Sequence, residues 1–419
     1  MNPRTNSLIF TLAIVLASCS LPEQKSPPTS TLSVGKWRAT LELQGQVLPF
    51  TFELKEVGNA SSDTSRIYEL YLENAEEKLR VDEVNLEGDS VRIPMHIFDT
   101  EIIAKNEGDQ WVGYWKKNYE EDYQLSFEAQ HANDYRFVPT ADKATVEVDG
   151  KWAVQFDDDS LTSIGIFQQQ GNRVTGSFLT STGDYRFLEG NVVNDELMLS
   201  TFDGEHAFLF RAKMQDDGSL KGDFWSGSHY HTTWTAQQDE NAALTDVNSL
   251  TYLKKNYDRL AFTFPNLQGD SVSLSDPEYE DQVVLVQIFG TWCPNCMDET
   301  KFLTDWYREN KDRGVEIIGL AYEQKDDFNY ARKRVQKMVD KLNVKYDFLI
   351  AGVSDKKKAA ETLPMLNRIM SFPTLIYIDR NGKVANIHTG FSGPGTGEYY
   401  EKFVQEFDER MNTLLNQPS

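Results

Sequence analysis

Two cysteines separated by two residues carry the strongest chemical signal in the chain, in the segment Trp292-Cys293-Pro294-Asn295-Cys296. The run before them, Val283–Phe289, is apolar and β-branched, which predicts a buried strand. The run after them, from Met297 to Lys311, has apolar residues at helical spacing, which predicts a helix. The cysteines therefore fall in the first turn of a helix, on one face.

A helix start favours redox chemistry at this pair. The unpaired amide groups and the macrodipole stabilise a thiolate at Cys293. Pro294 suits the first helical position, because that position needs no N–H. The Cα atoms should fall within the roughly 4.4–6.8 Å that a disulfide requires. We therefore expect a redox disulfide between Cys293 and Cys296.

The sequence gives less support to a structural role for the two cysteines than to a redox role. A disulfide that closes so short a loop removes little entropy from the unfolded chain. A zinc site would need two further ligands, and His388 is the only histidine in this region of the sequence. We expect neither a metal nor an organic cofactor here.

The third cysteine, Cys19, belongs to a different signal. Residues 1–18 have the features of a secretory signal peptide, with Arg4 before an apolar run. Leu16-Ala17-Ser18-Cys19 resembles the lipobox of bacterial lipoproteins, which implies cleavage before Cys19 and lipidation of its sulfur. The alternative is an ordinary secretory signal that leaves Cys19 free. The apolar run is too short for a membrane span, which needs about 20 residues.

We therefore expect an exported protein, lipid-anchored in the cell envelope and facing the periplasm. Ser20 follows the cysteine, which by resemblance to Gram-negative lipoproteins favours the outer over the inner membrane. The 42 Lys and Arg residues against 65 Asp and Glu give a net charge of −23. This balance argues against nucleic acid as a partner and against electrostatic docking to anionic lipid.

The length of 419 residues suggests two or three domains. The predicted divisions are the signal peptide (1–18), a tether (19–31), two β units (32–140 and 141–240), a connector (241–258) and an α/β domain (259–416).

The β region looks duplicated. Gly35-Lys36-Trp37 is repeated as Gly150-Lys151-Trp152, and Phe98–Glu101 is repeated as Phe202–Glu205. Short alternating runs and turn signals predict two related antiparallel units, which form two sandwiches or barrels or two halves of one.

Two features of the β region suggest binding. The Gly-Lys-Trp repeat resembles the G-x-W of lipocalin-like barrels, although such a tryptophan is more often a core plug. His229 and His231 alternate on one predicted strand and could ligate a metal, but two ligands are no site, and surface histidines are the simpler interpretation.

The C-terminal region predicts a sheet layered by helices. The expected elements are a helix within the connector (Leu250–Tyr257), strands at Val315–Leu320, Tyr346–Ile350 and Thr374–Ile378, helices at Phe328–Leu342 and Leu363–Ile369, a hairpin turn at Asn381-Gly382, and a final helix capped by Thr396. The stretch Glu323–Lys341 is expected to be a solvated helical surface.

Four spaced motifs together resemble the TlpA/ResA group of exported thioredoxin-like proteins. They are Phe264-Pro265-Asn266-Leu267-x-Gly269, Gly290-Thr291-Trp292-Cys293, Phe372-Pro373-Thr374 and Ile378-Asp379-Arg380-Asn381-Gly382-Lys383. The resemblance covers about residues 259–416 and implies the α/β thioredoxin fold.

The resemblance also implies roles. Cys293 would attack a substrate disulfide and Cys296 would resolve the mixed disulfide. Pro373 would be a cis proline beside the cysteines, and the backbone of Phe372 would align the substrate chain as an added strand. Trp292 and Pro294, which flank Cys293, complete the expected substrate-binding surface.

The expected proton carrier departs from thioredoxin itself. Thioredoxins have a buried aspartate six residues before the first cysteine, where this chain has Gln287. Glu299, one helical turn after Cys296, matches an acidic position of the TlpA/ResA group and would move the proton of Cys296. The alternative is a glutamate that only interacts with the helix dipole.

A second departure from the TlpA/ResA group concerns the direction of electron flow. The group usually places proline before the second cysteine, whereas Pro294 follows the first, as in CPxC oxidants. Reduction potentials in the wider family range from about −270 to about −120 mV, so the direction of electron flow stays open. We favour a reductant, supplied with electrons through a membrane protein.

The predicted function is thiol-disulfide exchange with protein substrates. One alternative is a peroxiredoxin-like thiol peroxidase, but Pro265 lies too far from Cys293 for the peroxidatic motif. The other is a non-enzymatic lipoprotein whose β units bind a ligand or partner. Replacing Cys293 by serine would separate activity from binding.

Overall fold

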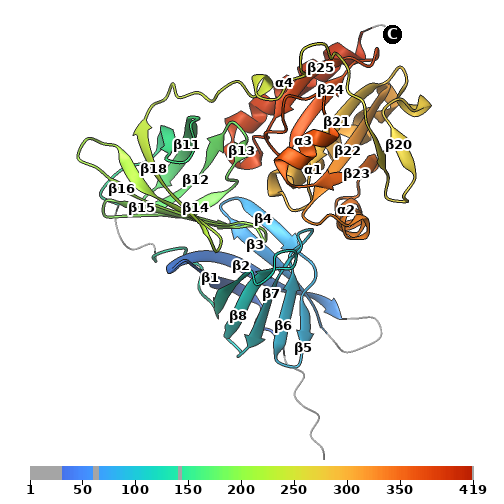
Figure 1. Ribbon diagram of the computed structural model, residues 1–419. Helices are drawn as coiled ribbons and strands as arrows, with labels where there is room; N and C mark the ends of the chain where they lie inside the picture. The colour runs from blue at the N-terminus through green and yellow to red at the C-terminus, as the bar shows by residue number, and fades with distance from the viewer. Residues whose placement is uncertain (1–30, 60–65, 140–143, 418–419) are drawn as a thin grey trace, which may run out of the picture.

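The computed structural model describes residues 31–59, 66–139 and 144–417. These residues form a first β unit, a second β unit and a C-terminal α/β domain, which meet at the centre of the molecule (Figure 1). The expected signal peptide and the lipidation site Cys19 lie outside the described residues. No helix among the described residues is long and apolar enough to cross a membrane.

The first β unit is a nine-stranded antiparallel sheet in the order β4-β3-β2-β1-β9-β8-β7-β6-β5. Its strands are β1 (Gly35–Leu43), β2 (Gln46–Asn59), β3 (Arg66–Asn74), β4 (Glu77–Val81), β5 (Asn85–Glu87), β6 (Ser90–Pro94), β7 (Thr100–Asn106), β8 (Gln110–Lys117) and β9 (Gln124–His131). The sheet curls but stays open, because β4 and β5 do not pair with each other.

The second β unit closes. Its strands are β10 (Gly150–Phe156), β11 (Ser163–Gln170), β12 (Arg173–Thr180), β13 (Gly183–Asp184), β14 (Leu188–Val193), β15 (Glu196–Phe202), β16 (Ala207–Met214), β17 (Leu220–Ser226) and β18 (Tyr230–Gln238). Strand β12 pairs with both β11 and β14, so the meander returns on itself as a barrel, and β13 forms a short pair at the end of β12.

The two units repeat one design, as the sequence repeats indicated. Trp37 and Trp152 take the same place on the first strand of each unit, and each indole donates to the carbonyl four residues earlier at 2.9 Å. Both tryptophans are fully buried, which supports the core-plug interpretation. The predicted all-β N-terminal region is therefore confirmed, as one open sheet and one barrel.

Aromatic rings fill the barrel. Phe210 stacks on Phe224 with ring centroids 4.2 Å apart and on Phe178 at 4.5 Å. Trp234 packs edge-on against Phe178 at 5.2 Å. A barrel interior packed with side chains in mutual contact has no room for a ligand such as a lipocalin binds.

The histidine pair of the barrel does not converge. His231 lies on β18, contacts Asp223 at 2.8 Å and stacks on Trp225. His229 precedes the strand. Within the described residues no group of three or more His, Cys, Asp and Glu side chains is placed to hold a metal ion.

The C-terminal domain has a five-stranded sheet in the order β23-β22-β21-β24-β25. Its elements are β19 (Thr263–Pro265) and β20 (Ser271–Ser273) in a separate pair, then β21 (Val283–Phe289), α1 (Pro294–Asn310), β22 (Val315–Glu323), α2 (Phe328–Leu342), β23 (Asp347–Val353), α3 (Lys356–Thr362), β24 (Thr374–Ile378), β25 (Val384–Thr389) and α4 (Glu398–Leu415). The predicted strand-helix order, the helix at Phe328–Leu342 and the hairpin at Asn381-Gly382 are confirmed.

Two predicted helices are wrong, for one shared reason. The connector has only a single 3-10 turn, at Val247–Ser249, in place of a helix at Leu250–Tyr257. Leu253 instead forms an antiparallel bridge with Leu366, and Lys254 donates its N–H to the carbonyl of Met365 at 2.7 Å. The segment predicted as the helix Leu363–Ile369 is instead a turn, closed by a hydrogen bond from the N–H of Leu366 to the carbonyl of Leu363 at 3.0 Å.

The neighbouring helix boundaries shift accordingly. Helix α3 forms earlier, at Lys356–Thr362, where the side chain of Asp355 caps it by accepting from two backbone N–H groups. Pro364 disfavours helical geometry at the residue before it, which ends α3 at Thr362. The last helix is capped by Gly397 rather than Thr396, which lies in a preceding 3-10 turn.

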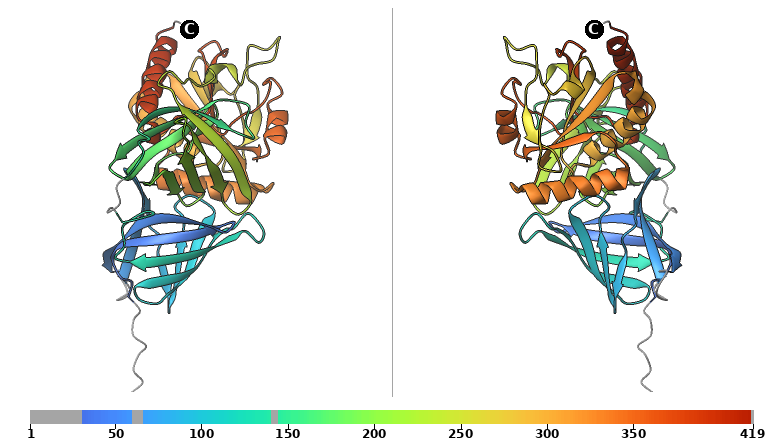
Figure 2. Two further views of the ribbon diagram at one scale, coloured as in Figure 1. Left: turned by 90° about the vertical axis from the view of Figure 1, so that its left-hand side faces the viewer. Right: turned by 90° about the vertical axis from the view of Figure 1, so that its right-hand side faces the viewer.

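Polar contacts join the three parts. Helix α2 runs along the first β unit (Figure 2), where Arg334 donates to the carbonyl of Ile97. Asn74 of the first unit exchanges hydrogen bonds with the backbone of Phe202 in the second, with its Nδ2 donating at 3.0 Å. Arg186 of the second unit forms ion pairs with both other parts.

Equivalent glycines provide a test of the duplicated fold. A Cβ at Gly113 would lie 2.0 Å from the carbonyl oxygen of Ile103, and one at Gly222 would lie 2.0 Å from that of Arg211. We expect Gly113→Ala and Gly222→Ala each to lower stability by about 1–3 kcal/mol or more. The control Gly218→Ala, in a turn at a φ of +80° with open space around it, carries the strain of that φ but no clash, so it should cost less. Urea unfolding followed by circular dichroism measures the difference, and equal losses in all three variants would contradict the account.

Candidate active site

The two cysteines lie where β21 ends and α1 begins. Cys293 is the N-cap of α1 and Pro294 is its first residue. The cysteines form a disulfide with their Cα atoms 5.2 Å apart. The backbone N–H of Cys296 points at the sulfur of Cys293, at 3.1 Å. After reduction this N–H and the helix dipole would stabilise a thiolate on Cys293.

The loop that contains Pro373 closes over the first cysteine. The Phe372–Pro373 peptide bond is cis, as predicted. The carbonyl oxygen of Phe372 lies 3.4 Å from the sulfur of Cys293. The Trp292 ring packs edge-on against the Phe372 ring at 5.5 Å, and its indole N–H donates to the carbonyl of Tyr322 at 2.9 Å. The predicted substrate-binding residues therefore lie around one sulfur.

Glu299 lies on α1 one turn after Cys296, and both residues are fully buried. Gln287 Nε2 donates to its Oε2 at 2.8 Å, whereas its Oε1 has no hydrogen-bond partner. Burial raises the pKa of Glu299 to about 8, and the hydrogen bond from Gln287 offsets only part of that rise. Gln287, at the position where thioredoxins have the buried aspartate, therefore contacts Glu299 directly.

A second buried acid escaped the sequence analysis. Glu323, expected on a solvated helix, is 1% exposed at the end of β22. It accepts hydrogen bonds at 2.8 Å from both the backbone N–H and the hydroxyl of Thr291, next to Trp292. Burial raises the pKa of Glu323 to about 7, despite these hydrogen bonds. The signal was its place at the end of an apolar run, which predicts burial rather than solvation.

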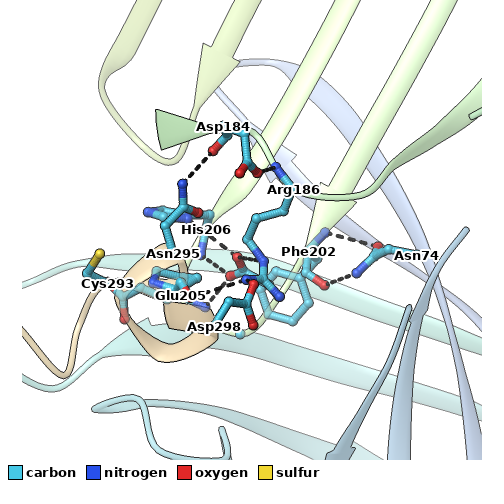
Figure 3. Close-up of polar contacts among 12 residues, drawn as sticks. Asn74, Asp184, Arg186, Phe202, Glu205, His206, Cys293, Asn295 and Asp298 are labelled. Atoms are coloured by element: carbon cyan, nitrogen blue, oxygen red, sulfur yellow. Dashed lines mark hydrogen bonds and ion pairs between the residues drawn. The ribbon is translucent and has the colours of Figure 1, made fainter. Parts of the chain in front are cut away.

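Residues of the second β unit complete the surroundings of the disulfide (Figure 3). Asn295, between the two cysteines, donates to the carbonyl of Asp184 at 3.1 Å. Arg186 donates to the carbonyl of Pro294 at 3.2 Å and forms an ion pair with Asp298 on α1. No motif connected this barrel segment with the cysteines, because the contact is long-range.

Comparison with known proteins agrees with the geometry. Residues 255–402 match the protein family described as Redoxin. The thiol-disulfide oxidoreductase ResA of Halalkalibacterium halodurans is 29% identical over 148 residues, which are 35% of this chain and 72% of that protein. ResA of Bacillus thuringiensis subsp. konkukian is 26% identical over 145 residues, which are 35% of this chain and 73% of that protein.

The C-terminal domain is a thioredoxin-like thiol-disulfide oxidoreductase of the TlpA/ResA type.

Two solved structures illustrate the extent of the likeness. A thiol-disulfide oxidoreductase from Bacteroides fragilis is 20% identical with a TM-score of 0.27, covering 36% of this chain and 99% of that one. The thioredoxin domain of a thiol-disulfide oxidoreductase from Bacteroides vulgatus is 23% identical with a TM-score of 0.27, covering 37% and 99%. The β units lie outside the residues that match Redoxin.

The buried acid of the thioredoxin-like domain predicts a pH dependence of stability. The folded-state pKa of Glu299, about 8, is above the ordinary value of 4.5. The stability that its neutral form provides is therefore complete below about pH 4.5 and is lost as the pH rises through about 8. We expect Glu299→Gln, which keeps the side chain neutral, to become progressively more stable than the wild type between these values.

Thermal unfolding from pH 5 to pH 9 measures this difference. Glu309→Gln is the matched control, because Glu309 lies exposed on the same helix. Its melting temperature should differ from that of the wild type by the same small amount at every pH. A Glu299→Gln curve parallel to the wild type would contradict a buried neutral acid.

Proposed function

We propose that this chain reduces disulfides in protein substrates of the cell envelope through the Cys293–Cys296 dithiol. The observation that carries the proposal is the cysteine pair at a helix start, beside the cis-proline loop, with Glu299 buried one turn further along α1. A helix N-terminus favours the nucleophile, and a buried acid with a raised pKa suits proton transfer near neutral pH.

The exchange would proceed in two displacements. The Cys293 thiolate attacks one sulfur of the client disulfide, so a mixed disulfide forms while the second client sulfur leaves as a thiolate and takes a proton from water. Cys296 gives its proton to the ionised form of Glu299, and its sulfur attacks the Cys293 sulfur, so the Cys293–Cys296 disulfide forms and the bond from Cys293 to the client breaks. The client sulfur that was bound to Cys293 leaves as a thiolate and takes a proton from water, and two electrons have passed from the dithiol to the client.

Each neighbouring residue supports one of these steps. The backbone of Phe372, beside cis Pro373, would align the client chain as an added strand, as the family resemblance implies. Trp292, which is half-buried, would contact the client beside the attacking sulfur, whereas Pro294 is buried and its carbonyl accepts from Arg186. Glu323 is a positioning residue, because it orients the Thr291 backbone rather than touching the sulfurs.

The cellular setting is part of the proposal. Lipidation at Cys19 would anchor the chain to a membrane, the outer more than the inner, with the catalytic domain in the periplasm. Regeneration of the dithiol needs two electrons, which a membrane protein of the dithiol-oxidoreductase class would deliver by the reverse exchange.

Serine variants test the reaction. In a chain that begins at Ser20, Cys293→Ser should abolish reduction of a disulfide-bonded test protein such as insulin. Cys296→Ser should lack turnover but accumulate a mixed disulfide with the test protein, because the first displacement survives. Mass spectrometry under non-reducing conditions detects that adduct. The absence of an adduct from both serine variants would contradict the proposed order of attack.

The reduction potential tests the direction of electron flow. Equilibration of the wild type with dithiothreitol buffers should give about −250 mV or lower, close to thioredoxin. A value above about −180 mV would instead make the protein an oxidant or isomerase, in keeping with the position of Pro294.

A further inference from the structure

A segment of the second β unit occupies the face of the thioredoxin-like domain that carries Cys293 (Figure 3). This segment, 181–187, connects β12 to β14 and contains the short strand β13. It contacts the loop with the cysteines, the loop before cis Pro373 and the loop after β25. These are the loops that surround the reactive sulfur.

Two backbone carbonyls of the segment are held by side chains on either side of the sulfur. The hydroxyl of Ser371 donates to the carbonyl of Thr182 at 2.5 Å. Asn295 Nδ2 donates to the carbonyl of Asp184 at 3.1 Å. Thr182 lies in the turn between β12 and β13, and Asp184 lies in β13, so the two donors hold the backbone at the tip of this hairpin.

The segment and the domain approach closely at two glycines. A Cβ at Gly183 would lie 2.7 Å from the amide nitrogen of Asn295, and a Cβ at Gly390 would lie 2.6 Å from the backbone of Thr182. Cys293 itself is only 6% exposed.

Charged and polar contacts hold the segment down. The Asp184 carboxylate accepts the backbone N–H of Gly393 at 2.7 Å. Arg186, 2% exposed, pairs with Asp298 on α1 and donates to the carbonyl of Pro294. The segment is thus bound by the same kinds of backbone and side-chain contacts that would bind a client.

We propose that residues 181–187 are an internal mimic of the client that covers Cys293, and that a polypeptide substrate must displace them to reach its sulfur. The incoming chain gives its own carbonyls to Ser371 and Asn295, which places its disulfide at Cys293. This inference rests on the proposed function and assigns the client class: a polypeptide whose backbone carbonyls are free to bind the site. Ser371 and Asn295 become the residues that read its backbone.

The reaction of Cys293 with reagents of different size tests whether segment 181–187 covers it. The reduced chain from Ser20 onward and a free cysteine peptide are each treated with N-ethylmaleimide and with a polyethylene-glycol maleimide. The quantity compared is the ratio of the two reaction rates, small reagent over large reagent. For the wild type we expect the large reagent to be disfavoured by about tenfold or more, which corresponds to about 1.4 kcal/mol in favour of the closed segment. A change in the pKa of Cys293 would alter both rates together and leave their ratio unchanged.

Gly183→Ala should weaken the discrimination, because alanine is strained at the φ of +146° here and its Cβ would push away the Asn295 amide that holds the carbonyl of Asp184. Gly171→Ala is the matched control: this glycine lies in the turn at the other end of β12, also at positive φ, with open space around it. It should keep the wild-type ratio. Asp184→Ala, which removes the acceptor for Gly393, is a second opening variant, and circular dichroism checks that each variant is folded.

Two results would overturn the inference. One is a wild-type ratio equal to that of the free peptide. The other is a ratio that neither Gly183→Ala nor Asp184→Ala changes while both variants stay folded. Reduction of insulin by the same variants separates this failure from failure of the proposed function. If the ratio shifts but no variant reduces a disulfide, the proposed function fails and the segment is no client mimic.

Discussion

One buried guanidinium, that of Arg186, joins all three parts of the molecule. Its nitrogens pair with Glu77 of the first β unit, Asp203 of the second and Asp298 of the thioredoxin-like domain. Removal of these charges from water is costly, and only close opposite charges and hydrogen bonds offset the cost. The planar fork of arginine suits several carboxylates at once, which a lysine would not match. The placement of the barrel on the redox site depends on this cluster.

Burial acts on the carboxyl groups around Arg186, but the pKa values of Asp203 and Asp184 shift in different directions. Burial would raise the pKa of Asp203, but His206 and Arg186 outweigh it and lower the pKa to about 2. Burial raises the pKa of Asp184 to about 6, although the Gly393 N–H and Arg186 favour its charged form. The surrounding acids in turn raise the pKa of Arg186, against the effect of burial. The cation is therefore retained, and its charge anchors the segment beside Cys293.

The sequence predicted the redox chemistry because local rules govern it. A buried strand, a proline at the first helical position and two cysteines one turn apart define the geometry within a few residues. The repeated Gly-Lys-Trp likewise marked the first strand of both β units. The predictions failed where tertiary contacts overrode local pattern: Leu253 pairs with Leu366, so two expected helices do not form.

The largest omission has the same origin. Nothing near Arg186 or Asp184 in the sequence indicates the cysteines, because their contacts depend on how the barrel docks on a domain more than a hundred residues later. Whether the barrel closes, as the second unit does, or stays open, as the first does, depends on one strand pairing that composition does not encode. The local chemistry could thus be predicted from the sequence, whereas the contact of the redox site with a neighbouring β unit required the structure.

The central claim is that a client and the segment 181–187 exclude each other at Cys293. The most direct measurement is hydrogen exchange of this segment in Cys296→Ser, with and without a cysteine peptide joined to Cys293 as a mixed disulfide. The account predicts that the attached peptide removes the protection of segment 181–187, while the protection of α2, which contacts the first β unit, stays unchanged. Unchanged protection of the segment with the peptide attached would contradict it, because both chains would then occupy the site together.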